Sequence, residues 1–188
     1  MLHEFAKALA MLFIIMDPFA SLPVFVAITK GKTADERVGA ANTATMSAAI
    51  AVISFILFGP ELLGVMGIAI ESFQIAGGLL LLLIAIQFTL GAEFGKYDEV
   101  DTAIVIIGVP LISGPGALTT AIVLAGKYGK PITFIAATVA LLLTYAILRK
   151  GSEIHRFLGM QGLEIFSRMM GVLLAALAVE FIRMGLGI

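Results

Sequence analysis

Pro-Phe-Ala-Ser-Leu-Pro at residues 18–23 returns 92 positions later as Pro-Leu-Ile-Ser-Gly-Pro at residues 110–115. Both copies read P-x-x-S-x-P, and each lies in the middle of a long apolar segment. A second match has nearly the same offset, since residues 73–88 align with residues 166–181 and place Gly78 opposite Gly171. Because the two offsets agree, we interpret the chain as a duplicated unit.

The composition around these motifs is that of a membrane protein. Of the 188 residues, 60% are hydrophobic and 13% are charged, and the mean hydropathy is +1.09. A soluble domain is nearer half apolar and a quarter charged, so the excess apolar surface must be covered by lipid. The chain has no cysteine and two histidines, both near the ends of predicted spans. We therefore expect no disulfide, no metal site and no cofactor, and the near-neutral charge gives no indication of a nucleic-acid partner.

Six segments are long and apolar enough to cross a hydrocarbon core of roughly 30 Å as helices. Runs such as Leu79 to Ile86 are continuously apolar, which does not fit the alternation of a β-barrel. The predicted spans are 4–29, 37–59, 65–90, 102–126, 131–149 and 163–187. The predicted breaks are a charged loop at 30–37, a tight turn at Gly59-Pro60-Glu61, an acidic loop at 93–101, a short turn at 126–131 and a long polar connection at 149–162.

Lysine and arginine in the short loops predict the orientation, because cytoplasmic loops carry an excess of both. We expect the richer side to face the cytoplasm, which puts both termini outside a cell (inner) membrane. The richer side carries Lys30, Lys32, Arg37, Lys96, Arg149, Lys150 and Arg156, and the other carries Lys7, Lys127 and Lys130 with Arg183 close by.

The repeated unit holds three predicted spans, so its second copy must enter the membrane from the opposite side. The predicted fold is therefore an all-α membrane domain of six helices, built as two inverted repeats at residues 1–92 and 93–188. Each repeat begins with a broken helix, because two prolines in six residues interrupt the helical hydrogen bonds. Such interrupted helices in inverted repeats indicate a transporter site near the membrane centre.

The two motifs predict a binding site where the second halves of spans one and four begin. Asp17-Pro18 and Gly114-Pro115 each read as an N-cap followed by the first helical residue, and we expect the chain to unwind within 18–23 and 110–115. Opposed helix N-termini attract an anion, while carbonyls near Ile15, Met16 and Val109 suit an ammonium group. Together these groups fit a zwitterion. The candidate substrate-binding residues are Asp17, Pro18, Ala20, Ser21, Pro110, Ser113, Gly114, Pro115, Gly116 and Ala117.

In the alternative interpretation, the prolines only kink packed helices. The two glycines separate the interpretations: if the carboxylate lies on backbone amides, a side chain at Gly114 or Gly116 should block its approach and leave the fold intact.

At these motifs the sequence resembles the MarC family of integral membrane proteins, whose members include small neutral amino acid transporters. The matching stretches are residues 17–25, residues 76–78 with the leucine run that follows, and residues 110–117. Ala20 stands where the family pattern leads us to expect glycine. The resemblance covers essentially the whole chain, and it implies six spans and transport of small neutral amino acids such as glycine or alanine.

Ionisable residues inside the membrane are costly and are taken first as functional candidates. Asp17 either caps the second half-helix or takes part in binding an amine or a proton. Glu180 shares a helix face with Arg183, which favours a structural ion pair, and Glu71 is placed to join them. Asn42 is a candidate for lining the substrate path.

The sequence thus predicts a transporter and not an enzyme. A passive channel or facilitator would use much of the same architecture. An intramembrane hydrolase with Ser21 or Ser113 as nucleophile is disfavoured, because no histidine or lysine is placed near the membrane centre as a base and G-x-S-x-G is absent. The sequence leaves open the coupling ion, proton or sodium, and the formation of a homo-oligomer.

Overall fold

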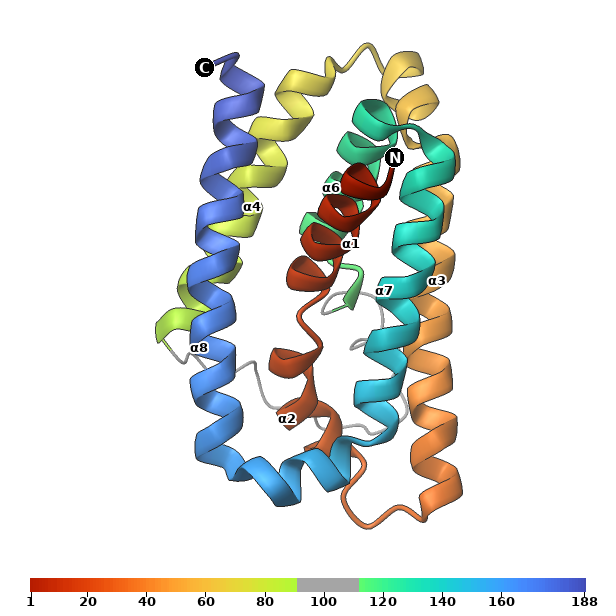
Figure 1. The fold of residues 1–188 in the computed structure, drawn as a ribbon, viewed down its shortest axis with the longest axis vertical. Helices are drawn as coiled ribbons and strands as arrows, with labels where there is room; N and C mark the ends of the chain where they lie inside the picture. The colour runs from red at the N-terminus through yellow and green to blue at the C-terminus, as the bar shows by residue number, and fades with distance from the viewer. Residues whose placement is uncertain (91–111) are drawn as a thin grey trace.

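The computed structural model describes residues 1–90 and 112–188, and the regular structure in these ranges is helical (Figure 1). Within these ranges, five segments are long and apolar enough to cross a membrane: Leu2–Leu22, Ala34–Val65, Ile70–Leu90, Lys130–Arg149 and Gln161–Leu186. The first part of the predicted span 102–126, residues 102–111, lies outside the described residues. The helices are α1 (Leu2–Met16), α2 (Pro18–Ile28), α3 (Ala34–Val65), α4 (Ile70–Leu90), α6 (Pro115–Tyr128), α7 (Lys130–Arg149) and α8 (Gly151–Leu186).

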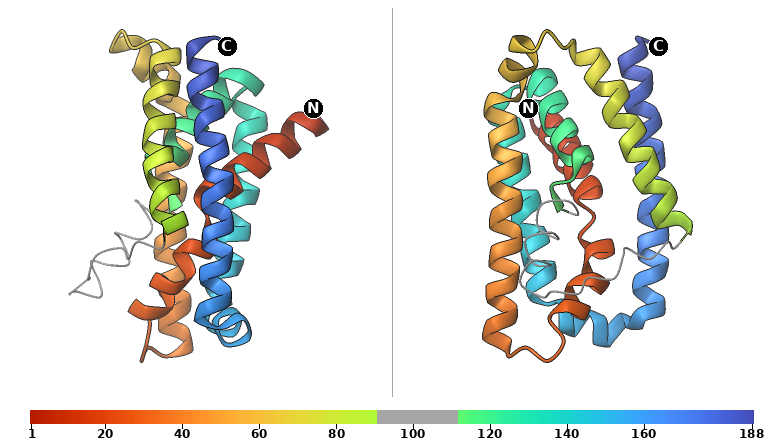
Figure 2. Two further views of the ribbon diagram at one scale, coloured as in Figure 1. Left: turned by 90° about the vertical axis from the view of Figure 1, so that its left-hand side faces the viewer. Right: turned by 180° about the vertical axis from the view of Figure 1, so that it is seen from behind.

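Three helices occupy the centre of the molecule and two helix pairs flank them (Figure 1). Helices α1, α2 and α6 lie between the pair α4 and α8 and the pair α3 and α7, and the view from behind shows the same pairs (Figure 2). The two members of each pair run in opposite directions. Helices α2 and α6 also run in opposite directions, each away from the middle of the molecule (Figure 1).

The flanking helices carry large apolar side chains on their outer faces. Met46 and Ile50 of α3, Leu83 of α4, Leu142 of α7 and Val172 of α8 are all exposed. In water such a surface would drive aggregation, whereas lipid covers it without cost. The inner faces are lined by small residues instead, so the helices approach each other closely, as is usual between membrane helices. The small residues buried on α3 and α7 include Ala40, Ala44, Ala48, Ala136, Ala137 and Ala140.

Local signals fix two of the helix boundaries. Thr33 and Glu36 form a capping box at the start of α3, in which the Thr33 hydroxyl accepts the Glu36 amide and the Glu36 carboxylate accepts the Thr33 amide. Gly129 separates α6 from α7 with φ of 86°, a left-handed conformation that favours glycine. The predicted short turn at 126–131 is thereby reduced to a single residue.

The predicted tight turn at Gly59-Pro60-Glu61 is wrong, because α3 continues through Pro60 to Val65. Gly59 serves packing: a Cβ at this position would lie 2.5 Å from Cγ1 of Ile122 on α6. The next turn of the chain comes instead after Met66, where Gly67 adopts φ of 66°.

The predicted connection at 149–162 does separate two spans, but it is helical, since α8 begins at Gly151 and bends at Gly159, where φ is 66°. The segment before the bend lies across one end of the molecule (Figure 1). Its helix forms because Ile154 and Leu158, four residues apart, share a face that packs against the core. Arg37 of α3 donates a hydrogen bond of 2.8 Å to the Ser152 hydroxyl and so ties this segment to the start of α3.

Candidate functional site

The break between α1 and α2 consists of one residue, Asp17. Its backbone is left-handed, with φ of 35° and ψ of 70°, a conformation that aspartate tolerates better than most residues. Its Oδ1 accepts the Ala20 amide at 3.1 Å, which is the N-cap interaction at the start of α2. The predicted pairing of an Asp17 cap with Pro18 as first helical residue is confirmed.

The prediction that the chain unwinds within 18–23 is wrong, since this motif lies inside α2. Pro18 lacks the amide that a first helical residue leaves unpaired in any case, so the helix needs only the Asp17 cap to begin there. The Ser21 hydroxyl donates to the Asp17 carbonyl oxygen at 3.1 Å. Its proton is therefore used within the helix and is not free for a substrate carboxylate.

The start of α6 is built differently. Gly114 is the N-cap residue, with φ of −60° and ψ of 175°, and Pro115 opens the helix as predicted. No side chain caps this end, so the first-turn amides of Gly116 and Ala117 have no partner within their own helix. Ser113, Gly114 and Ala117 are buried. Val109 and Pro110 lie outside the described residues, as does the part of the motif before Ile112.

The two helix starts lie close together near the middle of the molecule (Figure 1). A Cβ at Gly116 would lie 3.5 Å from Cγ2 of Ile15, two residues before the Asp17 break. The same Cβ would lie 2.8 Å from Cγ of Leu81 on α4. A side chain at Gly116 would have to displace the Leu81 side chain of α4, which argues against the expectation that such a substitution leaves the fold intact.

Among the residues that the structure describes, one carboxylate oxygen of Asp17 has no partner. The residue is 2% exposed, and its Oδ2 is buried with no hydrogen bond. A buried carboxylate oxygen without a partner is costly, and a neutral asparagine or serine would cap α2 as well. The cap interaction alone therefore does not account for an aspartate at this position.

The other ionisable candidates lie away from the break. Glu180 and Arg183 form the predicted ion pair on α8, with 3.6 Å between Oε2 and Nη1. Glu71 forms no ion pair with the residues that the structure describes. Its backbone carbonyl oxygen packs closely against Gly185 of α8. Asn42 is exposed on α3 and does not line an enclosed path.

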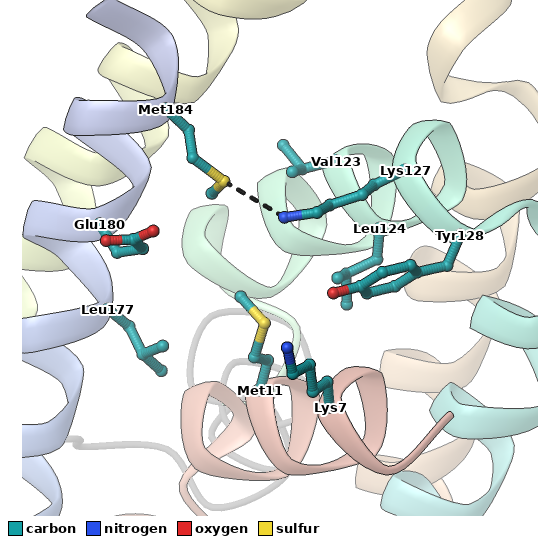
Figure 3. Close-up of a pocket in the computed structure, with 9 residues that line it drawn as sticks. All are labelled: Lys7, Met11, Val123, Leu124, Lys127, Tyr128, Leu177, Glu180 and Met184. Atoms are coloured by element: carbon teal, nitrogen blue, oxygen red, sulfur yellow. Dashed lines mark hydrogen bonds between the residues drawn. The ribbon is translucent and has the colours of Figure 1, made fainter. Parts of the chain in front are cut away.

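A cavity of about 180 Å³ lies between α1, α6 and α8 (Figure 3). We call it the α1–α6–α8 cavity. The last turns of α6 and α8 lie toward the end of the molecule that carries the C-terminus (Figure 1). Of the residues that line the cavity, only Glu180 was a functional candidate from the sequence, because no sequence pattern indicates that the second turn of α1 meets the last turn of α6. The lining residues are Lys7 and Met11 of α1, Val123, Leu124, Lys127 and Tyr128 of α6, and Leu177, Glu180 and Met184 of α8.

Comparison with known proteins gives the family. The model described as MarC family integral membrane protein matches residues 2–187. The UPF0056 membrane protein MJ1677 of Methanocaldococcus jannaschii is 31% identical, over 98% of this chain and 97% of its own. A UPF0056 membrane protein of Aquifex aeolicus is 32% identical over 97% and 92%, and the UPF0056 membrane protein YhcE of Escherichia coli is 32% identical over 93% and 88%.

None of the solved structures matches the chain. The family match nevertheless spans nearly every residue, including both proline–serine motifs and the flanking helices. The chain belongs to the MarC family of integral membrane proteins.

Proposed function

We propose that the protein is a secondary transporter of small neutral amino acids that binds its substrate where α2 and α6 begin. The observation that carries the proposal is the difference between the two helix starts. One is capped by a buried aspartate whose second oxygen has no partner among the described residues, and the other is capped by a glycine with no side-chain cap. The first therefore attracts a cation and the second an anion.

A substrate that carries both a positive and a negative group would match the two helix starts. The ammonium group of an amino acid would bind Oδ2 of Asp17, and its carboxylate would bind the amides of Gly116 and Ala117. Asp17 already occupies the Ala20 amide at the start of α2, so the carboxylate has one helix start available and not two. Ser113 and Ala20 are buried at this site, so we expect a substrate with a small side chain, such as glycine or alanine.

The proposal includes an inverted repeat, which the packing of α4 and α8 supports. A Cβ at Gly78 would lie 2.8 Å from the carbonyl oxygen of Ala178. One at Gly171 would lie 3.1 Å from the carbonyl oxygen of Ala85. The aligned sequences pair Gly78 with Gly171 and Ala85 with Ala178, so these are one contact made twice, as a two-fold axis between antiparallel helices requires.

The buried faces of α3 and α7 also support an inverted repeat. Four buried positions of α3 correspond, 92 residues later, to buried positions of α7, and the two helices run in opposite directions (Figure 1). Two inverted units of three spans would give six spans in total. The matching sets are Ala44, Ala48, Val52 and Ile56 on α3 and Ala136, Ala140, Thr144 and Leu148 on α7.

We infer an orientation with both termini outside the cytoplasm. Arg37 and the start of α8 are hydrogen-bonded at the lysine- and arginine-rich end, while Lys130 pairs with Glu61 at the opposite end. A reporter that is active only in the cytoplasm should therefore give no signal when fused to Ile188. The same reporter inserted after Gly31 should be active, and a strong signal at Ile188 would reverse the orientation.

Uptake by purified protein in liposomes tests the proposed function. We expect uptake of glycine and alanine, and the dependence on an imposed proton or sodium gradient should separate a coupled transporter from a passive facilitator. A hydrolase would instead lose its activity on replacement of Ser113. Absence of any amino acid uptake by monodisperse protein would refute the proposal.

Gly114→Val should reduce this uptake at least tenfold, because the side chain stands where the carboxylate approaches the α6 amides. Ser113→Ala should cost tenfold at most, since one hydroxyl hydrogen bond is worth roughly 0.5–1.5 kcal/mol. Gly39→Val is the matched control, because a Cβ at Gly39 meets open space on α3. Normal uptake by Gly114→Val would show that the carboxylate does not bind at the α6 amides.

A further inference from the structure

The α1–α6–α8 cavity brings two ammonium groups toward one space. Lys7 reaches in from α1 and Lys127 from α6, and the side chain of Glu180 faces them from α8 (Figure 3). The ammonium of Lys127 lies 3.9 Å from the Met184 sulfur and 5.6 Å from the ring centroid of Tyr128, both of which are weak partners. Within the described part of the chain, neither lysine forms an ion pair.

An anion between the two lysines would give both a strong hydrogen-bond partner. On the opposite wall, Glu180 supplies the complementary negative charge. Its ion pair with Arg183 is long, at 3.6 Å, and the Glu180 side chain is 52% exposed. The rest of the lining is mostly apolar, including Met11, Leu124 and Leu177. This combination suits a small molecule with a carboxylate, an ammonium group and an apolar remainder.

The volume and the position agree with such a ligand. A cavity of about 180 Å³ has the volume of about six waters at roughly 30 Å³ each, which is more than one ion needs. Lys7 is ten residues from Asp17 on α1, and Lys127 is eleven residues from Gly116 on α6. At 1.5 Å per residue, both helices place the cavity about 15 Å from the starts of α2 and α6. This is half the thickness of the hydrocarbon core, so a site at the membrane centre would put the cavity at the membrane surface.

We propose that the α1–α6–α8 cavity is a second binding site for a small neutral amino acid, at the membrane surface on the side of the termini. The substrate carboxylate binds Lys7 and Lys127, and its ammonium group binds Glu180. This proposal rests on the proposed function, because it makes the cavity the place where substrate is held before or after the site at Asp17 and Gly114.

A tryptophan reporter tests the site directly, since the chain contains no tryptophan. Tyr128→Trp places the only indole in the cavity lining, and Gly114→Val in the same chain blocks the central site. In phosphatidylcholine nanodiscs, alanine should give a saturable fluorescence change. Propionate, which has only the carboxylate, should give a weaker one, and alaninamide, which lacks the carboxylate, should give none at the same concentration.

Charge variants test which side chains bind the carboxylate and which binds the ammonium group. In the reporter chain, Lys7→Gln and Lys127→Gln should each weaken alanine and propionate binding about tenfold or more. Glu180→Gln should weaken alanine binding by a similar factor and leave propionate binding unchanged. Lys130→Gln is the matched control, because it removes the same charge from the same end of the molecule but outside the cavity, where Lys130 pairs with Glu61. It should change neither.

Uptake measured with the native Tyr128 gives a second readout. Lys7→Gln should raise KM for alanine supplied from the side of the termini and leave the maximal rate nearly unchanged. The proposal is overturned if this KM is unchanged, if alanine causes no saturable fluorescence change, or if Lys130→Gln has the effect of Lys127→Gln. It is also overturned if phosphatidylglycerol, and not alanine, changes the fluorescence, because the lysines would then bind lipid phosphate.

The two proposals fail in different ways. Absence of uptake together with alanine-dependent fluorescence would refute the transport function and retain this site. Normal uptake without any fluorescence response or KM effect would refute this site and retain the transport function.

Discussion

Asp17→Asn is expected to reduce glycine and alanine uptake to less than a tenth of normal while the protein remains folded. Asparagine tolerates the left-handed backbone at this position, and its side-chain oxygen can still accept the Ala20 amide. Only the second oxygen changes, because asparagine has an uncharged NH2 group in its place. Loss of a charged partner for the substrate ammonium costs roughly 1.5–3 kcal/mol, which is a tenfold to hundredfold loss of affinity.

Asp17→Ala separates the two roles of the residue. It removes the cap as well as the charge and places alanine at positive φ, so we expect a loss of about 1–3 kcal/mol in stability in addition to the loss of uptake. Thermal unfolding in detergent measures the first effect and liposome uptake the second. If Asp17→Asn transports like the parent protein, Asp17 is only a helix cap and the ammonium must bind elsewhere.

Gly78→Val and Gly171→Val are expected to destabilise the protein strongly and to similar extents. At both positions even a Cβ would lie within 3.1 Å of backbone atoms of the facing helix, which cannot move aside as a flexible side chain can. Overpacking of this kind costs about 1–3 kcal/mol, or an apparent Tm lower by roughly 2–12 °C for a chain of this size. The similar losses follow from the equivalence of the two contacts.

Gly39→Val and Gly64→Ala serve as controls in the same unfolding measurement. Both glycines lie on α3, where an added Cβ meets open space, and neither has a positive φ. We expect changes within a few degrees of the parent Tm, because the substituted side chains only replace glycine in a helix. A normal Tm for Gly78→Val, or a loss at only one of the paired positions, would contradict the two-fold packing of α4 and α8.

The sequence was most informative where residue chemistry acts locally. Asp17-Pro18 and Gly114-Pro115 were assigned correctly as helix starts, because a capping side chain or glycine followed by proline favours a start whatever the surroundings. The ion pair of Glu180 with Arg183 was found from helical spacing alone. The continuous apolar runs were also sufficient to predict a helical membrane protein.

The sequence was least informative where a glycine or proline could either form a turn or site, or serve helix packing. Gly59-Pro60 reads as a turn, but Gly59 is small because Ile122 packs onto it, and the long helix accommodates Pro60. Gly116 was expected to accept a side chain without loss of the fold, but Leu81 lies where that side chain would go. The α1–α6–α8 cavity depends on contacts between segments more than 100 residues apart in the chain, and no local pattern encodes them.

The two copies of the proline–serine motif begin their helices at different prolines. Helix α2 begins at Pro18, the first proline of its copy, whereas α6 begins at Pro115, the second proline of its copy. In related halves, exchanging these choices would shift each helix start by five residues, about 7.5 Å along the helix axis. If the protein is the transporter with inverted repeats proposed above, such an exchange would turn an opening from one side of the membrane to the other.

The exchanged starts would place Leu22 and Val109 at the N-cap positions in place of Asp17 and Gly114. Leucine and valine cap helices poorly, at a cost of about 1 kcal/mol each. We therefore expect the empty protein to rest with its helix starts as described, and the reversed opening to become populated only when bound substrate repays that difference.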